Sequence, residues 1–329
     1  MCTAVSFLSG DHYFGRNLDL EYCYDEAVTI TPRNYPFQFR NKETIPYHFA
    51  MIGIATAASG YPLYYDATNE AGLSVAALNF PGNAFYGGME KDMYNIAPFE
   101  LIPWILCQCK TVQDAALLLS RTNLVGISFS PDYPLTDLHW IISDKERSIT
   151  AEPLKEGLIV TENPVGVLTN NPPFDYHLHN IKNYLSLSEN DPENHFAPGL
   201  SLKPYSRGMG AMGLPGDLSS ASRFIKAAFT KLHSVTPKEE AGAVSQFFHI
   251  LGSVCQQEGC VKVGDCFEKT FYYSCCNTDK GIYYYTTYEN SQISAVHMHK
   301  EHLDGSRLIS YPLLRTAQIR CEKQEFYES

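Results

Sequence analysis

Apolar and polar residues alternate over short stretches at both ends of the chain, a pattern typical of β-strands covered on one face. Residues 2–8 and 12–16 predict two strands of a hairpin that turns at Gly10-Asp11. The stretch 49–55 is apolar throughout, as expected for a strand in a sheet covered on both faces. Further strands are predicted at residues 27–31, 73–79, 139–142, 149–151, 157–160, 271–274, 282–286 and 293–296.

Helical patterns occupy the middle of the chain. The segment 98–106 is apolar on most sides and should pack inside, and Thr111 should cap the helix that follows it. Ser219-Ser220 should cap a helix that contains Arg223. The run Thr236-Pro237-Lys238-Glu239 predicts another helix start, with a capping box and proline at the first helical position. Residues 175–185 are weakly helical, and 190–216 should form a long loop region.

Groups of strands flank the helices, and neither an internal repeat nor a convincing linker is visible. We therefore predict a single α+β domain, residues 1–329, built from layers of sheet and helix.

Charge and composition exclude several classes of function. The net charge is −11 and no basic run of five or more residues occurs, so we expect neither a nucleic-acid partner nor binding to an anionic membrane. We see neither a signal-peptide pattern nor an apolar run long enough to span a membrane, and we expect a cytoplasmic protein. The ten cysteines include no C-x-x-C spacing, so they should be mostly reduced, and we expect neither a metal nor another cofactor.

The chain begins Met1-Cys2-Thr3, which places a cysteine where it becomes the first residue once Met1 is removed. Cys2 would then carry a thiol and a free α-amine, whose reference pKa of about 7.7–8.0 allows it to take the thiol's proton near neutral pH. Such a residue is a nucleophile with its own base. A cysteine at the second position of a lightly packed terminus is the alternative interpretation.

Two charged residues lie three apart just after the strand predicted to pair with the Cys2 strand. Arg16 could lower the pKa of the thiol by Coulomb attraction, and Asp19 could accept a hydrogen bond from the α-amine. A structural Arg–Asp pair that braces a turn is the equally plausible alternative.

Other polar residues stand at the ends of apolar stretches. Asn79 ends a predicted strand and could donate to an oxyanion or brace the following turn. Asn170-Asn171 poses the same choice, and either asparagine could cap its turn. Arg223 lies in the first turn of a helix, where the helix dipole disfavours a cation, so a specific partner is expected unless it is simply exposed.

Taken together, motifs in the same order along essentially the whole chain resemble the choloylglycine hydrolases, also called bile salt hydrolases. They include Met-Cys-Thr, Phe14-Gly15-Arg16-Asn17-Leu18-Asp19, Leu78-Asn79-Phe80-Pro81-Gly82, Val167-Leu168-Thr169-Asn170-Asn171-Pro172, Gly213-Leu214-Pro215-Gly216-Asp217, Ser222-Arg223-Phe224 and Gly281-Ile282-Tyr283-Tyr284-Tyr285.

This resemblance implies the four-layer αββα sandwich of the N-terminal nucleophile hydrolases. It also implies that Cys2 attacks the amide linking a bile acid to glycine or taurine, with its α-amine as base and then as acid toward the departing amine. Asn79, with the backbone or side chain of Asn170, would form the oxyanion hole. The catalytic positions matched by the family are Cys2, Arg16, Asp19, Asn79, Asn170 and Arg223.

The resemblance further implies a homotetramer and a steroid pocket near Leu18, Tyr65, Phe129 and Tyr133, although core packing is the alternative for these apolar and aromatic residues. Penicillin V acylases share the scaffold and the cysteine but typically carry tyrosine at the position of Asn79, which favours bile salts. The sequence does not rank glycine against taurine conjugates.

Overall fold

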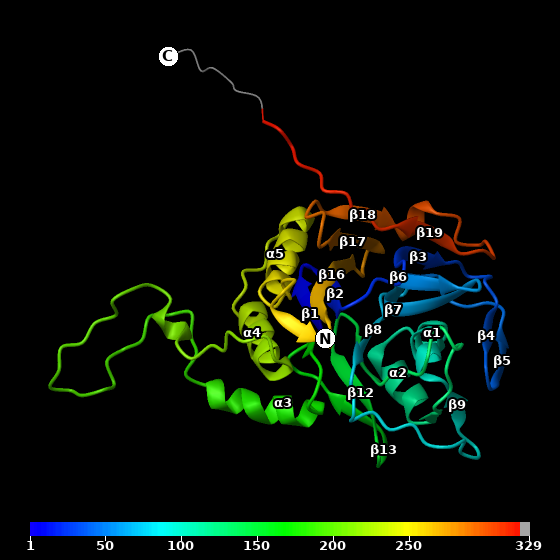
Figure 1. The fold of residues 1–329 in the computed structure, drawn as a ribbon, viewed down its shortest axis with the longest axis horizontal. Helices are drawn as coiled ribbons and strands as arrows, with labels where there is room; N and C mark the ends of the chain where they lie inside the picture. Colours follow the sequence, from blue (N-terminus) through cyan, green and yellow to red (C-terminus); the bar gives the residue numbers. More distant parts are fainter. Residues whose placement is uncertain (323–329) are drawn as a thin grey trace.

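The computed structural model describes residues 1–322 and has the predicted α+β architecture: two large antiparallel sheets stack face to face between layers of helix (Figure 1). The first sheet contains, in spatial order, β14 (Val167–Leu168), β1 (Cys2–Ser9), β2 (Asp11–Leu20), β16 (Cys266–Asn277), β17 (Ile282–Thr287) and β18 (Ser294–His297), with β15 (Val261–Val263) paired to β16.

The second sheet supplies the other inner layer. Its spatial order is β13 (Gly157–Glu162), β12 (Ser148–Leu154), β11 (Leu138–Ser143), β8 (Ser74–Asn79), β7 (Tyr61–Asn69), β6 (Met51–Ala58), β3 (Ala27–Thr31) and β19 (Ile309–Pro312). Smaller pairs are formed by β4 (Phe37–Phe39) with β5 (Lys42–Ile45), and by β9 (Tyr94–Ile96) with β10 (Thr122–Leu124).

Helices cover the outer faces of the two sheets. On the second sheet lie α1 (Leu101–Leu106), all of whose residues are buried, and α2 (Val112–Leu119), which starts at the predicted Thr111 cap. On the first sheet lie α4 (Ser220–Leu232), capped by Ser219 as predicted, and α5 (Glu240–Gly252), with α3 (Phe174–Asn180) beside α4. Single 3₁₀ turns occur at Pro98–Glu100, Ile181–Tyr184, Met209–Ala211 and Met298–Lys300. Within residues 1–322, no helix combines the length and apolar character that crossing a bilayer requires.

One helix start differs from the prediction. The capping signal at Thr236 does not begin α5, which starts four residues later at Glu240 after an N-cap residue, Glu239, whose side chain makes no cap bond. The Pro237 carbonyl instead accepts a 2.8 Å hydrogen bond from the hydroxyl of Ser9 on the β1–β2 hairpin. This tertiary contact holds the segment in a non-helical conformation despite its local helix signal.

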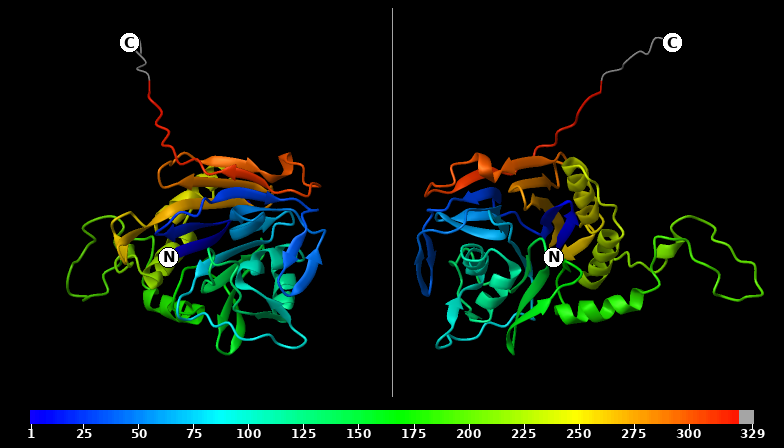
Figure 2. Two further views of the ribbon diagram at one scale, coloured as in Figure 1. Left: turned by 45° about the vertical axis from the view of Figure 1, so that its right-hand side comes forward. Right: turned by 180° about the vertical axis from the view of Figure 1, so that it is seen from behind.

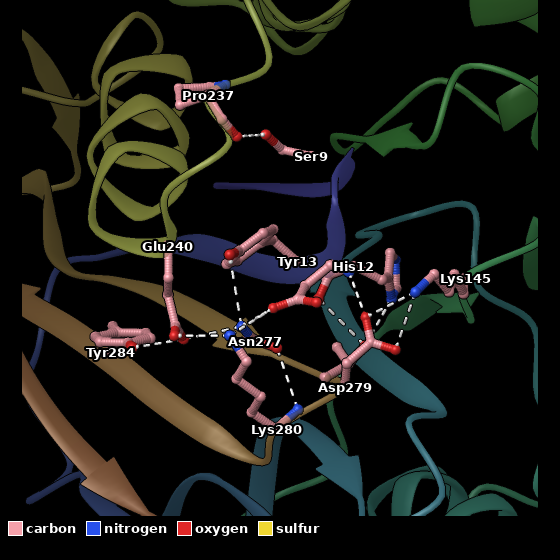
Figure 3. A network of polar contacts seen from close by, with 12 residues as sticks. Ser9, His12, Tyr13, Lys145, Pro237, Glu240, Asn277, Asp279, Lys280 and Tyr284 are labelled. Atoms are coloured by element: carbon pink, nitrogen blue, oxygen red, sulfur yellow. Dashed lines mark hydrogen bonds and ion pairs between the residues drawn. The ribbon is translucent and has the colours of Figure 1, made fainter.

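The β1–β2 hairpin turns at the end of the sandwich opposite Cys2, where a charged network ties it to its neighbours (Figure 3). Asn277 on β16 donates to Asp11 and to Glu240 of α5, each at 2.9 Å. Lys280 forms ion pairs with both carboxylates at 2.8 and 2.9 Å. The network therefore fixes hairpin, sheet and helix relative to one another.

Residues 185–213 leave the body of the molecule between α3 and α4 and form the green excursion in Figures 1 and 2. Much of this segment, which we call the arm, lacks regular structure, in keeping with the predicted long loop. It nevertheless exposes large apolar side chains, among them Leu185, Phe196 and Tyr205, each more than four-fifths exposed. Isolated apolar residues are common on protein surfaces, but a protruding segment that carries several is unusual.

Candidate active site

Cys2 is the first residue of β1, and its side chain is buried between the layers. Antiparallel pairing places it opposite Leu18 of β2, with Arg16 opposite Ala4 and Asp19 just beyond the end of β1. The two strands thus bring the predicted arginine and aspartate to the cysteine's end of the sheet. The Cys2 backbone N–H donates to Oδ1 of Asn170 at 2.8 Å.

Arg16 is fully buried and is held by peptide carbonyls. Its Nη1 donates to the backbone oxygen of Tyr65 at 3.0 Å and to that of Ala77, both in the second sheet. Burial opposes its charge, but Coulomb interactions with Cys2, Tyr272 and Asp66 outweigh this effect and raise the pKa of Arg16 above its ordinary value. A fixed cation therefore stands beside the sulfur.

Arg223 approaches the cysteine from α4. Its Nε donates to the Leu218 carbonyl at 3.0 Å, and its two terminal nitrogens meet three further acceptors. Nη1 donates to the Cys2 carbonyl at 2.6 Å and to the Thr3 hydroxyl at 2.7 Å, while Nη2 donates to Asn170 Oδ1 at 2.7 Å. Burial lowers the pKa of Arg223, with Asp19 and Cys2 acting in the opposite direction. These contacts provide the specific partners that its place in a first helical turn predicted.

The two asparagines of the predicted oxyanion hole touch each other. Asn170 Nδ2 donates to the backbone oxygen of Asn79 at 2.7 Å, and the Asn170 backbone N–H donates to Ser220 Oγ at 2.8 Å. The second hydrogen of Nδ2 is therefore a more available donor than the backbone N–H. Asn171, the other member of the pair, donates to Pro81 O at 2.6 Å and braces the turn.

Asp19 accepts a 2.6 Å hydrogen bond from Thr270 through Oδ1, while Oδ2 has no protein partner within residues 1–322. Burial raises its pKa, against the opposing effects of Arg223 and the terminal amine. That amine belongs to Met1 here; it donates to the Asp19 carbonyl at 2.8 Å and forms a 2.7 Å ion pair with Glu268. Burial likewise raises the pKa of Glu268.

Sequence reasoning missed Glu268 and Thr270. Both lie on β16, on the inward face that they share with Tyr272 and Ser274. The predicted strand begins at Phe271 and therefore omits the alternation of buried and exposed positions across residues 266–270. A glutamate at an inward position of a strand was the available signal, because buried carboxylates require partners.

A cavity of about 330 Å³ opens beside the cysteine. Cys2, Arg16 and Asn79 lie at one part of its wall, and most of its other lining residues are apolar or aromatic. All residues predicted for the steroid pocket line it, although Leu18 also belongs to the core between the sheets. These four are Leu18, Tyr65, Phe129 and Tyr133.

Comparison with known proteins covers nearly the whole chain. Residues 2–311 match the family model described as linear amide C–N hydrolases, choloylglycine hydrolase family. A bile salt hydrolase/transferase of Lactiplantibacillus plantarum is 56% identical over 97% of this chain and 98% of its own, and one of Clostridium perfringens is 38% identical over 97% and 99%.

Solved structures agree with this result. A mutant conjugated bile acid hydrolase from Clostridium perfringens superimposes with a TM-score of 0.90 at 36% identity, covering 98% of this chain and 100% of its own. A penicillin V acylase from Agrobacterium tumefaciens has a TM-score of 0.76 at 16% identity, covering 94% and 91%, and shares the fold. The chain belongs to the choloylglycine hydrolase family of linear amide C–N hydrolases.

Proposed function

We propose that this protein hydrolyses the amide bond of glycine- or taurine-conjugated bile acids, with Cys2 as the nucleophile after Met1 has been removed. The observation that carries the proposal is the placement of a buried cysteine between Arg16, Arg223 and Asn170, at the wall of a largely apolar cavity. Apolar walls with a few fixed polar groups suit a steroid body joined to an amide. The bile salt hydrolases among its relatives support the same assignment.

Removal of Met1 supplies the base. In the full chain the Cys2 nitrogen is a peptide amide whose lone pair is delocalised, so it cannot accept the thiol's proton. As a free α-amine hydrogen-bonded to Asn170 Oδ1, the same nitrogen has that lone pair available. The Cys2 thiolate then attacks the carbonyl carbon of the substrate and forms a tetrahedral intermediate.

Collapse of the intermediate breaks the C–N bond. The protonated α-amine gives its proton to the departing nitrogen of glycine or taurine, and the bile acid remains as a thioester on Cys2. Water, deprotonated by the same amine, attacks the thioester, and the free bile acid leaves as the thiol is restored. Each proton that the amine takes is thus returned within one cycle.

Asn79 and the free hydrogen of Asn170 Nδ2 are the proposed donors to the oxyanion. Loss of one such donor typically removes about 2.7–4 kcal/mol of transition-state stabilisation. Arg16 favours the thiolate through its charge, Asp19 orients the α-amine, and Arg223 fixes the Cys2 and Asn170 oxygens.

The test is release of amino acid from glycocholate and taurocholate by the purified enzyme, with penicillin V as the competing substrate and Cys2→Ser as the control. We expect release from at least one conjugate and its near-complete loss in the variant. Hydrolysis of penicillin V with no release from either conjugate would assign the chain to acylase chemistry instead. Full activity of Cys2→Ser would exclude the nucleophile.

Acyl transfer is a second activity to expect, because relatives from three organisms carry the name bile salt hydrolase/transferase. The thioester can be attacked by the nitrogen of a free amino acid in place of water, which forms a new amide and restores the thiol. Incubation of the enzyme with glycocholate and an excess of a second amino acid should then yield the exchanged conjugate, detected by mass spectrometry. Cholate as the sole product would limit the enzyme to hydrolysis.

We further propose a cytoplasmic homotetramer in which the arm packs on a neighbouring copy. The exposed Phe196 and Tyr205 support this, since an interface would remove them from water. Light scattering after size-exclusion chromatography should report four copies, and fewer in Phe196→Ser/Tyr205→Ser. A monomeric unsubstituted protein would refute the assembly.

A further inference from the structure

Two buried histidines stand behind the oxyanion residues and take no part in the mechanism above. His139 lies on β11 and His177 on α3, and neither side chain reaches solvent. His139 Nε2 donates to the backbone oxygen of Thr169 at 3.0 Å, and His177 Nε2 donates to that of Asn170 at 3.0 Å. Two successive carbonyls of the chain segment that carries the Asn170 amide are thus each held by an imidazole.

Each ring also stacks on a phenylalanine next to a site residue. His139 lies nearly parallel to Phe80, with ring centroids 4.2 Å apart and planes 6° apart, and Phe80 directly follows Asn79. His177 stacks on Phe224 at 4.8 Å and 28°, directly after Arg223. The two histidines therefore join three separate elements, β8, the turn after β14 and α4, at the positions of the three site residues.

The hydrogen bonds also define where the protons lie. The backbone oxygen of Thr169 can only accept a hydrogen bond, so His139 Nε2 carries a hydrogen, and His139 Nδ1 faces Glu152 Oε1 at 2.9 Å. Glu152 is itself fixed by the Phe174 N–H at the start of α3. His177 also carries a hydrogen on Nε2, because the Asn170 backbone oxygen can only accept. Its Nδ1 has no protein partner within residues 1–322.

We propose that His139, held by Glu152, and His177 are positioning residues that set the Asn170 amide relative to Asn79 and Cys2. The inference rests on the proposed amidase mechanism, in which Asn170 Nδ2 donates to the oxyanion. A donor must lie within hydrogen-bond distance of the position the oxyanion takes, and a displacement of about 1 Å can lower the rate about 100-fold. Rotation of the 169–170 peptide planes would permit such a displacement, and the imidazoles oppose it together with the bond from the Asn170 N–H to Ser220.

The experiment compares His139→Leu and His177→Leu with the unsubstituted enzyme on glycocholate. The kcat is normalised to the fraction of chains whose Cys2 reacts with iodoacetamide, measured by mass spectrometry on the N-terminal peptide because exposed cysteines such as Cys260 also react. We expect kcat to fall at least tenfold while KM changes less than about twofold, because neither side chain lines the cavity. His139→Gln, which keeps a donor toward Thr169, should recover part of the loss. A role limited to folding would lower the yield or melting temperature and leave the normalised kcat unchanged.

A matched control and a milder variant cover other outcomes. His12→Leu removes an equally buried histidine at the far end of the sandwich, and it should destabilise the protein without changing the normalised kcat. If His139→Leu does not fold, Phe80→Leu removes the stack while keeping an apolar side chain at this buried position, and it should still lower kcat. Folded variants with unchanged kcat would overturn the positioning role, whereas an unsubstituted enzyme inactive on every conjugate would instead overturn the proposed function.

Discussion

His12, buried at the hairpin end of the sandwich, should make the protein lose stability as the pH falls. Its ring bridges the hydroxyls of Ser6 and Thr278 at 2.9 and 2.8 Å. Its backbone N–H donates to Asp279 (Figure 3). Burial lowers the pKa of His12 from 6.5 to about 4. Asp279 and Asp144 oppose this shift, and the nearby lysines Lys231 and Lys145 add to it.

The direction follows from proton uptake. In the unfolded chain His12 binds its proton as the pH falls through about 6.5, whereas the folded protein binds it only near pH 4. The contribution of His12 to stability is therefore complete above about pH 6.5 and is lost progressively down to about pH 4. A difference of about 2.5 pKa units corresponds to about 3.4 kcal/mol in the limit, and to about 2 kcal/mol between pH 7.5 and pH 5.

Chemical denaturation at about pH 7.5 and pH 5 measures this loss. His12→Asn should be less stable than the unsubstituted protein at pH 7.5. Between pH 7.5 and pH 5, its free energy of unfolding should fall by about 2 kcal/mol less than that of the unsubstituted protein. His195→Asn, at an exposed position on the arm, should keep the full pH dependence. A residual slope is expected in every variant, because burial also lowers the pKa of His177. An equal loss in His12→Asn and the unsubstituted protein would refute the reasoning.

Three other changes have defined outcomes. Enzyme that retains Met1, as shown by intact mass, should release no glycine from glycocholate, because the nucleophile's nitrogen is then an amide; activity in such a sample would exclude the α-amine as base. Asn79→Ala should lower kcat about 100- to 1000-fold with little change in melting temperature, and a loss confined to KM would argue against an oxyanion role. Gly15→Ala should lower the free energy of unfolding by about 1–3 kcal/mol or more, since its Cβ would stand 1.9 Å from the Ser274 oxygen. Gly199→Ala, which has open space, serves as the control, and equal stability of the two variants would contradict the argument.

Local pattern was sufficient for much of the fold. Alternation and the Gly10 turn define the β1–β2 hairpin, and the capping residues Thr111 and Ser219 begin their helices as predicted. The prediction was wrong at Thr236, where a bond from Ser9, far away in the sequence, overrides the local helix signal. The start of β16 was also missed, and a register shift between Thr270 and Tyr272 interrupts its pairing with β2.

The residues of the candidate site also differ in how far the sequence could predict their positions. Arg16 could be placed near Cys2 because hairpin register is a local property, set by the turn between the strands. Arg223 and Asn170 stood out as candidates from their local positions, but only the resemblance to a family placed them at the same site as Cys2, since their contacts with it join residues more than 150 positions apart. Glu268 matches no motif quoted from the sequence, and only the folded chain shows it beside the terminal amine.

If the enzyme matures by loss of Met1, as proposed, the contacts of the Met1 amine limit when that can happen. Once the chain has folded, this amine is bound to the Asp19 carbonyl and to the buried carboxylate of Glu268. An aminopeptidase must draw the terminal residues into its own active site, which would require the start of β1 to leave the sheet. We therefore expect excision to compete in time with folding, during or soon after synthesis. Chains that fold first would be kinetically trapped as an inactive form, so the active fraction of a preparation would depend on how quickly its first strand was processed.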